Sequence, residues 1–421
     1  MSVNRRSFLQ EVKSQLSSKE AKLKIEAELD DHLLRTKQSW IEKGLEEQEA
    51  ETKAVLQMGS PTLLGKQLNK LHRPKVDWLL IGLLLTILSF GLLSLFTLSR
   101  FGYSGFSFSK AVVSVIIGLC VSMIMMFIDY RKIRHLGWLF YLAGAGILIV
   151  IHFFFNITIN ARAYLSIASF AIDSTMAIPF FLLAWASFFS SQTFRIWKFL
   201  LLFLLSLFLL LQNSTLSIIY LYSVTVFIML WWSPFTKKSV IMITFSTLAL
   251  VGTSSVILWG KLMIYQKMRF LAFLHPDVYD NSTLLLAHRL IREAGWFGHA
   301  ISKSALSSPQ ADLVFVSFTY MFGWILAGIL VLLMILLTIR MFYVLPRIQD
   351  SYGKRLLAGA AALYTIQLLS NLGMVVGFFP IITLALPFIS YGLTPMLLNS
   401  FLIGIALSVY RRKDLHIDYA K

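Results

Sequence analysis

The sequence predicts an all-α membrane protein that crosses the bilayer about ten times and begins with a small helical domain. Of the 421 residues, 57% are hydrophobic and only 14% are charged, and the mean hydropathy is +0.72. Apolar runs of the ~20-residue length that spans a bilayer recur through most of the chain. This composition excludes an ordinary soluble globular enzyme.

Residues 1–75 are predicted to form a cytoplasmic helical domain, because their apolar residues recur with helical spacing. Phe8, Val12 and Leu16 fall on one face, and a second face carries Ile25, Leu29 and Leu33–Leu34. The tetrapeptide Ser17-Ser18-Lys19-Glu20 predicts a helix start, residues 41–45 close that helix, and residues 46–56 supply another. The residues Asp30-Asp31-His32 favour a solvated helix face over a metal site.

The segment GLEEQEAETKAVLQMGSPTLLGKQL, residues 44–68, resembles the short cytoplasmic prefix domain that precedes some bacterial permeases. The first residues are polar and charged, so we expect no cleavable signal peptide. Residues 76–413 are predicted to form the membrane domain and residues 414–421 a short cytoplasmic tail. The single cysteine, Cys120, lies in an apolar run and is predicted to be a small core residue.

Ten spans are predicted from the apolar runs. They lie near residues 77–98, 110–128, 136–155, 171–190, 196–212, 214–233, 239–259, 313–339, 356–376 and 393–410. Alternate connections are basic and are therefore expected to face the cytoplasm. The basic residues are Arg131, Lys132, Arg134, Arg195, Lys198, Lys237, Lys238, Arg340, Arg347, Lys354, Arg355, Arg411, Arg412 and Lys413. An even number of spans then places both termini in the cytoplasm and leaves the long segment 260–312 outside, before span eight.

Acidic residues are scarce beyond residue 76, so each one is informative, because ionised groups near lipid are costly. Asp77 and Asp129 neighbour basic residues at cytoplasmic ends and are expected to form surface ion pairs. Asp173 is interpreted as a helix cap at the start of span four. Asp312 immediately precedes the apolar run of span eight. It can cap that helix, or it can accept a proton from a sugar hydroxyl at the outer interface.

Basic residues share the predicted outer face with Asp312. They are Arg162, Lys261, Lys267, Arg269, Arg289, Arg292 and Lys303. Such side chains can simply extend toward lipid headgroups, or their guanidinium groups can bind a lipid diphosphate. The histidines of this region, His275, His288 and His299, lack the spacing of zinc ligands. The net positive charge indicates contact with anionic membrane lipids and no nucleic-acid partner.

The segment Gly377 to Gly392, GFFPIITLALPFISYG, is apolar but interrupted by proline. Pro380, Pro387 and the nearby Pro395 lack a backbone N–H, and each disfavours helical geometry in the residue before it. Unsatisfied backbone in hydrocarbon costs several kcal/mol per group. The segment is therefore predicted to be buried in protein or to line a wet cavity beside span ten.

Residues 371–412, NLGMVVGFFPIITLALPFISYGLTPMLLNSFLIGIALSVYRR, closely resemble the C-terminal signature of the SEDS family, the RodA/FtsW/SpoVE proteins. The run Leu386 to Gly392 is the most specific part, and Gln367, Asn371 and Gly373 also fit. Weaker matches follow in the expected order along residues 77–413. They are FIDYRKI (127–133), INARAYL (159–165), LQNSTL (211–216) and the stretch 273–324 that contains SPQADLVFVSFTYMFGW.

The resemblance implies a ten-span peptidoglycan glycosyltransferase that polymerises lipid II at the outer membrane face for cell shape, division or sporulation. It implies that Asp312 is the base or the group that orients the acceptor. Diphosphate contacts are expected from Arg162, Arg289 and Arg292, and Asn371, Ser390 and Tyr391 are expected to line the substrate cavity. A divalent cation is compatible with this chemistry, although the sequence shows no ligand set for one. The expected partner is a single-pass class B penicillin-binding protein that crosslinks the product.

The chain departs from the family pattern at several positions. Positions usually occupied by glutamate read Thr319-Tyr320-Met321, and a motif that usually carries an acid reads Ile172-Asp173-Ser174-Thr175. Asn213-Ser214 replaces a proline and an aspartate, and Gly392-Leu393 replaces a double glycine. Two alternatives therefore stay open beside the enzyme: a non-enzymatic scaffold that regulates envelope synthesis, and a transporter of lipid-linked precursors.

Overall fold

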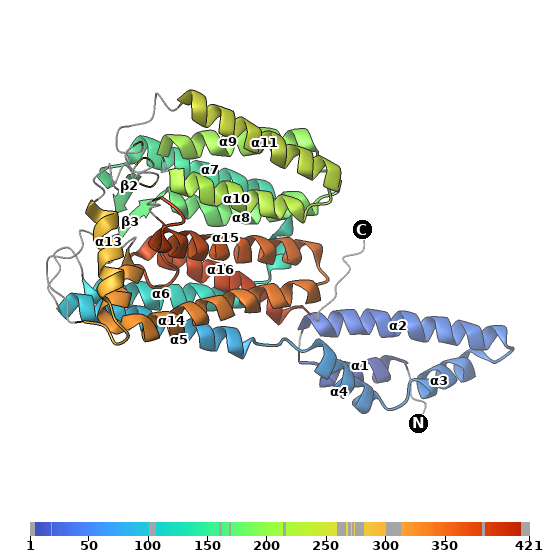
Figure 1. Ribbon diagram of the computed structural model, residues 1–421. Helices are drawn as coiled ribbons and strands as arrows, with labels where there is room; N and C mark the ends of the chain where they lie inside the picture. Colours follow the sequence, from blue (N-terminus) through green and yellow to red (C-terminus); the bar gives the residue numbers. More distant parts are fainter. Residues whose placement is uncertain are drawn as a thin grey trace. The chain divides into compact units, whose positions relative to one another are not determined.

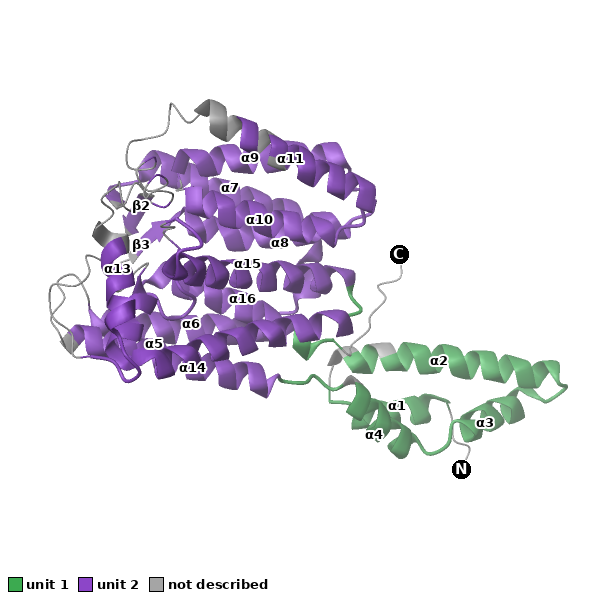
Figure 2. Ribbon diagram, in the orientation of Figure 1, with its two compact units in different colours: residues 1–76, 348–350, 410–421 green, residues 77–347, 351–409 purple. Residues whose placement is uncertain are grey.

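The computed structural model divides into two compact units (Figures 1 and 2). One comprises residues 1–76, 348–350 and 410–421, and the other residues 77–347 and 351–409. The structure describes residues 5–17, 19–100, 107–159, 162–167, 170–213, 216–258, 267, 271, 273, 282–299, 313–380 and 384–413. Asp312 and most of the segment 260–312 lie outside the described residues.

The first unit is a small bundle with its own apolar core. Its helices are α1 (Arg5–Gln15), α2 (Lys19–Glu42), α3 (Glu47–Gln57) and α4 (Pro61–His72). Phe8 and Val12 of α1 pack in one buried cluster with Ile25 and Leu33 of α2, as the spacing predicts. Leu34 is 43% exposed and does not share the buried face of Leu33, contrary to the prediction, because successive helical residues point about 100° apart.

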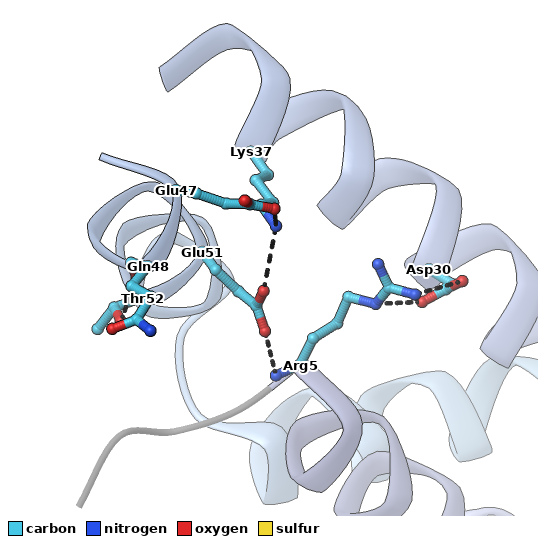
Figure 3. Close-up of polar contacts among 7 residues, drawn as sticks. All are labelled: Arg5, Asp30, Lys37, Glu47, Gln48, Glu51 and Thr52. Carbon is cyan, nitrogen blue, oxygen red and sulfur yellow. Dashed lines mark hydrogen bonds and ion pairs between the residues drawn. The ribbon is translucent and has the colours of Figure 1, made fainter. Parts of the chain in front are cut away.

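Ion pairs join the helices of the first unit (Figure 3). The Arg5 Nε atom lies 2.8 Å from Asp30 Oδ1, and Lys37 Nζ lies 2.7 Å from Glu47 Oε1. Glu51 accepts a hydrogen bond from the Arg5 backbone N–H at 3.2 Å. The hydrogen bond from Lys37 lowers the pKa of Glu47 below its usual value. Asp30 is thus engaged in an ion pair, in line with the predicted polar helix face.

The second unit contains helices at all ten predicted span positions. They are α5 (Trp78–Arg100), α6 (Phe108–Phe127), α7 (Gly137–Phe154), α8 (Ala177–Ser190), α9 (Ile196–Asn213), α10 (Leu216–Trp231), α11 (Lys237–Leu258), α14 (Val314–Val344), α15 (Ser351–Val376) and α16 (Leu393–Arg411). Seven helices of the described chain are long and apolar enough to cross a membrane, and α8 and α10 are shorter apolar helices. The polytopic all-α prediction is confirmed, while the number of crossings and their orientation stay predictions.

Helices α15 and α16 form the centre of this bundle. In each, 72% of the apolar window is buried, compared with at most 39% in the other candidate spans. Cys120 on α6 is exposed, so its predicted burial is wrong. A lipid-facing helix surface is as apolar as a protein core, so hydropathy alone does not distinguish the two.

A three-stranded antiparallel sheet, which the sequence interpretation missed, follows α7 (Figure 1). Its strands are β1 (Ile157–Ile159), β2 (Arg162–Ile167) and β3 (Phe170–Asp173). The predicted start of span four at residue 171 is therefore wrong. Asp173 ends the sheet, since its buried carboxylate accepts hydrogen bonds from the N–H and the hydroxyl of Thr175, at 3.2 and 3.0 Å. The predicted capping role of Asp173 is confirmed for the short 3-10 helix η2 (Ser174–Met176) that leads into α8.

Two ion pairs at the predicted cytoplasmic ends of the helices are buried and not superficial as expected. Asp129 and Arg131 form a bidentate pair, with 3.0 Å from Nε to Oδ1 and 3.0 Å from Nη2 to Oδ2. Their side chains are 7% and 6% exposed. Asp77, at the start of α5, is 1% exposed and lies 2.9 Å from the Nε atom of Arg340 on α14. The sequence could not predict that these two ion pairs are buried, because burial depends on how neighbouring helices pack around them.

Helix α14 is broken at Gly323, and a turn from the preceding connection fills the break. Gly323 has φ 80° and ψ 173°. The N–H of Trp324 donates to the carbonyl of Gly295 at 3.0 Å, and the N–H of His299 donates to the carbonyl of Tyr320 at 2.8 Å. The backbone groups freed by the break are thus satisfied by residues 295–299. This contact holds the half-helix 314–322, which begins two residues after Asp312 in the chain.

Replacing Gly323 with alanine is expected to destabilise the second unit. A Cβ atom at Gly323 would lie 2.2 Å from the carbonyl oxygen of Trp296, and one at Gly298 would lie 2.2 Å from that of Met321. Both obstacles are backbone atoms, and the φ of Gly323 alone costs a non-glycine residue about 1–3 kcal/mol. Thermal unfolding of the purified protein in detergent measures the effect. The control is Gly328→Ala, because a Cβ atom at Gly328 would have no neighbouring atom within 4 Å. An equal loss of thermal stability in both variants would contradict this account.

Candidate functional site

The proline-broken segment starts where α15 ends, at the same end of the bundle as the sheet (Figure 1). Gly377 ends the helix with φ 91°, and the N–H groups of Phe378 and Phe379 turn back to the carbonyl of Gly373, at 2.8 and 3.3 Å. Phe388 adopts φ 65°, a conformation that bulky residues rarely take. A non-glycine residue in this region indicates a backbone held by its surroundings.

Buried polar side chains of α15 and of the segment itself hold its backbone. Asn371 on α15 donates its Nδ2–H to the carbonyl of Leu384 at 2.8 Å, and the N–H of Leu386 donates to the Oγ of Ser390 at 2.8 Å. Asn371 and Ser390 are 1% and 3% exposed. The predicted burial in protein is confirmed for residues 384–390, whereas Phe378 and Phe379 at the start of the segment are 75% and 37% exposed. The structure also gives Ser390 a turn-forming role that its motif alone did not reveal.

A second contact links the two central helices below this segment. Asn399 of α16 donates from Nδ2 to the carbonyl of Pro395 at 2.9 Å and to the Oε1 of Gln367 on α15 at 3.3 Å. All three groups are inside the bundle, where an unpaired amide would cost free energy. Gln367, which matches the family signature, therefore helps to hold α15 against α16.

The segment packs against α5 and against the first half of α14. A Cβ atom at Gly91 of α5 would lie 2.7 Å from the carbonyl oxygen of Phe388, so only glycine permits this approach. Tyr391 packs against a buried cluster that includes Met321 of α14 and Leu95 of α5. The chain thereby brings the segment next to the half-helix that follows Asp312. Asp312 itself lies outside the described residues, and the N-cap position of α14 belongs to Leu313.

Helix α13 (Ser282–Glu293) lies across this end of the bundle (Figure 1). Ala287 and Leu290 are buried, whereas Arg289 and Arg292 are exposed. The Nε of Arg289 lies 2.8 Å from Glu293, and this hydrogen bond raises the pKa of the arginine. The two predicted diphosphate contacts on α13 therefore face outward, and one of them shares its guanidinium group with a carboxylate.

His288 is a candidate that the sequence interpretation considered only as a metal ligand. A Cβ atom at Gly377 would lie 3.6 Å from the Cε1 atom of its ring, so the ring abuts the start of the broken segment. Its Nε2 atom is buried and has no hydrogen-bond partner among the described residues. No spacing in the sequence could have indicated this contact, because it joins two segments that are separated by α14 and most of α15.

Arg162 begins β2, where its backbone pairs with that of Ile159. The sheet is tied to α16 by a hydrogen bond from the hydroxyl of Thr394 to the carbonyl of Ala171, at 3.3 Å. The structure thus brings the backbone of Arg162 to the same end of the unit as α13 and the broken segment (Figure 1). The side chain of Arg162 is not among those described.

Comparison with known proteins identifies relatives of this arrangement. Residues 74–415 match the FtsW/RodA/SpoVE family model, described as cell cycle protein. The probable peptidoglycan glycosyltransferase FtsW of Trichlorobacter lovleyi is 27% identical over 34% of this chain and 40% of its own length. Stage V sporulation protein E of Bacillus subtilis is 26% identical over 40% of this chain and 48% of its own. The peptidoglycan glycosyltransferase MrdB of Escherichia coli is 28% identical over 39% of this chain and 48% of its own length. The chain thus spans less than half the length of these curated relatives.

Solved structures share the fold over a larger part of the chain. A chain from the structure described as "Structural coordination of polymerization and crosslinking by a peptidoglycan synthase complex" is 22% identical with a TM-score of 0.68, covering 80% of this chain and 98% of that one. Rod shape determining protein RodA of Thermus thermophilus is 20% identical with a TM-score of 0.59, covering 82% of this chain and 98% of that one. Because the family match runs through the whole apolar unit, this chain belongs to the FtsW/RodA/SpoVE family and is a multi-pass protein of the bacterial cytoplasmic membrane.

Proposed function

We propose that this protein is a peptidoglycan glycosyltransferase that polymerises lipid II at the outer face of the cytoplasmic membrane. The observation that carries the proposal is the family match over residues 74–415, since similar curated relatives bear the name peptidoglycan glycosyltransferase. The buried broken segment supports it, because backbone of this kind at membrane depth is tolerated beside protein or a cavity. Residues 1–75 would form a cytoplasmic domain, residues 76–413 the catalytic membrane domain and residues 414–421 a tail.

In the proposed reaction, the 4-hydroxyl of the acceptor sugar attacks the anomeric carbon of the donor glycan. A new C–O bond forms as the bond from that carbon to the undecaprenyl diphosphate breaks, with inversion. The acceptor hydroxyl must lose its proton, and Asp312 is the carboxylate that we assign to receive it. Ionised acids are scarce on the predicted outer face, which makes Asp312 a strong candidate for this role.

The departing diphosphate carries negative charge that the protein must stabilise. Arg289 and Arg292 are the candidates on α13, where both are exposed. Arg162 is the candidate on the sheet. Planar guanidinium groups suit phosphate oxygens because they donate two parallel hydrogen bonds. Arg289 would have to exchange its hydrogen bond with Glu293, or share it, to bind a phosphate.

Asn371, Ser390 and Tyr391 would shape the wall of the substrate cavity. Asn371 and Ser390 hold the segment backbone through the hydrogen bonds to Leu384 and Leu386. Their contribution to substrate binding would therefore be indirect, through the position of the broken segment. His288, whose buried Nε2 atom abuts Gly377, is a further polar group at this wall.

A class B penicillin-binding protein is the proposed partner. Support comes from the similar solved chain, which belongs to a peptidoglycan synthase complex that coordinates polymerisation and crosslinking. A polymerase of this kind needs a second activity that crosslinks its product.

The test is a polymerisation assay with labelled lipid II. The purified protein is incubated with lipid II alone and together with candidate class B penicillin-binding proteins, and glycan chains are resolved on a gel. We expect polymer in at least one combination, with the partner made inactive for crosslinking as a control. The absence of polymer with every partner would refute the proposed activity. Movement of labelled lipid II across sealed vesicles by such an inactive protein would support transport.

A non-enzymatic scaffold is the second candidate, and one observation favours it. The family positions that usually carry glutamate are Thr319-Tyr320-Met321 here, and Thr319 is fully buried with its hydroxyl bonded to the carbonyl of Phe315 at 2.8 Å. No acid replaces the missing ones at these three positions. Under this alternative, an Asp312→Ala variant would still restore growth in a strain that depends on the protein.

A further inference from the structure

A separate cavity of about 480 Å³ lies at the opposite end of α7 from the sheet and the broken segment. It is an open cavity lined by the 3-10 helix η1 (Tyr130–Leu136), the start of α7, the end of α8 and the turn into α9. Helix α7 has 18 residues, so the two sites are separated by about 27 Å along its axis. The basic-loop pattern places this cavity at the cytoplasmic face. Its size is within the range of small-ligand sites.

The cavity combines basic groups with hydroxyl groups. Arg134, His135 and Lys198 line it, together with the polar residues Ser187, Ser190, Ser191, Gln192 and Thr193. The lining, which consists entirely of described residues, contains neither Asp nor Glu. Within the described chain, no carboxylate forms an ion pair with Arg134 or Lys198. No carboxylate therefore neutralises these two charges, and the ammonium group of Lys198 lies 5.7 Å from the ring centroid of Trp197. Arg131, in the same 3-10 helix as Arg134, is already paired with Asp129.

The walls of the cavity are partly aromatic, and contacts join the elements that form them. The ring of Phe188 stacks on that of Phe194 with centroids 5.2 Å apart, and the ring of Trp138 meets Phe188 edge-on at 5.2 Å. The hydroxyl of Ser187 donates to the carbonyl of Arg134 at 2.5 Å, which joins α8 to η1. These contacts join η1, α7, α8 and the turn into α9 around the cavity.

The surface around the cavity suits a lipid. On α7, Leu139 and Leu142 are 58% and 63% exposed, and on α9 Leu201 is 54% exposed. Trp138 and Trp197 are also more than half exposed, at 55% and 56%, as expected of tryptophans at a membrane interface. An amphiphile could place its acyl chains on these leucines while its headgroup enters the cavity. A soluble anion would make no use of this apolar surface.

We propose that this cavity is a binding site for the headgroup of an anionic phospholipid of the inner leaflet, with Arg134 and Lys198 as the phosphate contacts. The hydroxyl and amide groups of Ser191, Gln192 and Thr193 would contact the polar part of the headgroup. The site is independent of the proposed glycosyltransfer, because it lies at the other end of the bundle. It would tie the η1–α7 and α8–α9 connections to the acidic lipid of the membrane.

The test measures binding of fluorescently labelled phosphatidylglycerol to the full-length protein in neutral detergent. Two double variants remove the same charge: Arg134→Gln with Lys198→Gln inside the cavity, and Lys237→Gln with Lys238→Gln at the exposed start of α11. We expect the first to weaken binding about 30-fold and the second less than about threefold, given the usual contribution of a basic residue near anionic lipid. Gln192→Trp, which fills the mouth from an exposed position without changing the charge, is expected to weaken binding as well.

Competition separates a lipid from a soluble phosphate compound. Unlabelled phosphatidylglycerol should displace the probe, while phosphatidylcholine and glycerol 3-phosphate at the same concentration should not. Equal weakening by the two double variants would overturn the proposal, since it would show only a general charge effect. Displacement by glycerol 3-phosphate as effective as that by the lipid would assign the cavity to a soluble ligand and would also overturn it. Each variant is first checked for an unchanged elution volume and unfolding temperature.

Discussion

Replacing Asp312 with alanine is expected to lower the rate of glycan polymerisation by about 10²- to 10⁴-fold, which is the usual contribution of a general base. Asp312→Asn should lose nearly as much activity, because the amide keeps the shape but cannot accept the proton. The measurement is the initial rate of polymer formation from labelled lipid II by the protein with its partner. Binding of lipid II should remain, since the assigned role is in the chemical step.

The control for Asp312 is Asp280→Ala, which removes a carboxylate from the same predicted outer segment. A general effect of charge on this face would reduce the activity of both variants equally. A helix-capping role for Asp312 would instead lower stability by about 0.5–2 kcal/mol and leave the rate unchanged. The structure already places the N-cap of α14 at Leu313. A polymerisation rate unaffected by Asp312→Ala would refute its assignment as the base.

Replacing Asp129 with alanine is expected to lower the free energy of unfolding by about 3–5 kcal/mol, the usual loss when one partner of a buried ion pair is removed. Arg131 would keep a charge that is 6% exposed, without the carboxylate that now accepts hydrogen bonds from its Nε, its Nη2 and its backbone N–H. The same carboxylate caps η1, so the variant should also loosen this 3-10 helix. Thermal and detergent-induced unfolding of the purified protein measure the change.

Two further variants make this second prediction specific. Glu293→Ala breaks the exposed pair with Arg289, whose side chains are 49% and 74% exposed, and should change the stability by at most about 1 kcal/mol. The double replacement of Asp129 by leucine and Arg131 by methionine removes both charges and should recover much of the stability. A loss no greater for Asp129→Ala than for Glu293→Ala would show that the buried pair does not hold this end of the unit.

The membrane helices could be predicted from the sequence because hydropathy and length are local properties. The predicted spans 196–212 and 393–410 correspond to α9 and α16, which run from 196 to 213 and from 393 to 411. Local rules fail where an apolar stretch does not continue as a helix. The stretch 157–173 forms a sheet because its strands pair with one another. In addition, the side chain of Asn156 makes two hydrogen bonds with the backbone of Ser166, at 3.0 and 2.8 Å.

Part of the candidate site was also visible in the sequence. The broken segment was predicted to need a protein environment, and Leu386 and Ile389 in it are fully buried. The family resemblance supplied Asp312, Asn371, Ser390 and Tyr391 as candidates. The contact between His288 and Gly377 could not be predicted, because it depends on how α13 packs against α14 and α15.

The sequence by itself determined that this protein is a polytopic helical member of the FtsW/RodA/SpoVE family with a separate polar N-terminal segment. Composition, span length and a contiguous signature carry that information. Only the tertiary structure decided which polar groups are buried in pairs, how residues 295–299 complete the broken α14, and where the cavity beside Arg134 and Lys198 lies. The physical reason is that burial and hydrogen-bond satisfaction depend on atoms from distant parts of the chain, as when Trp324 bonds to Gly295 and not within its own helix.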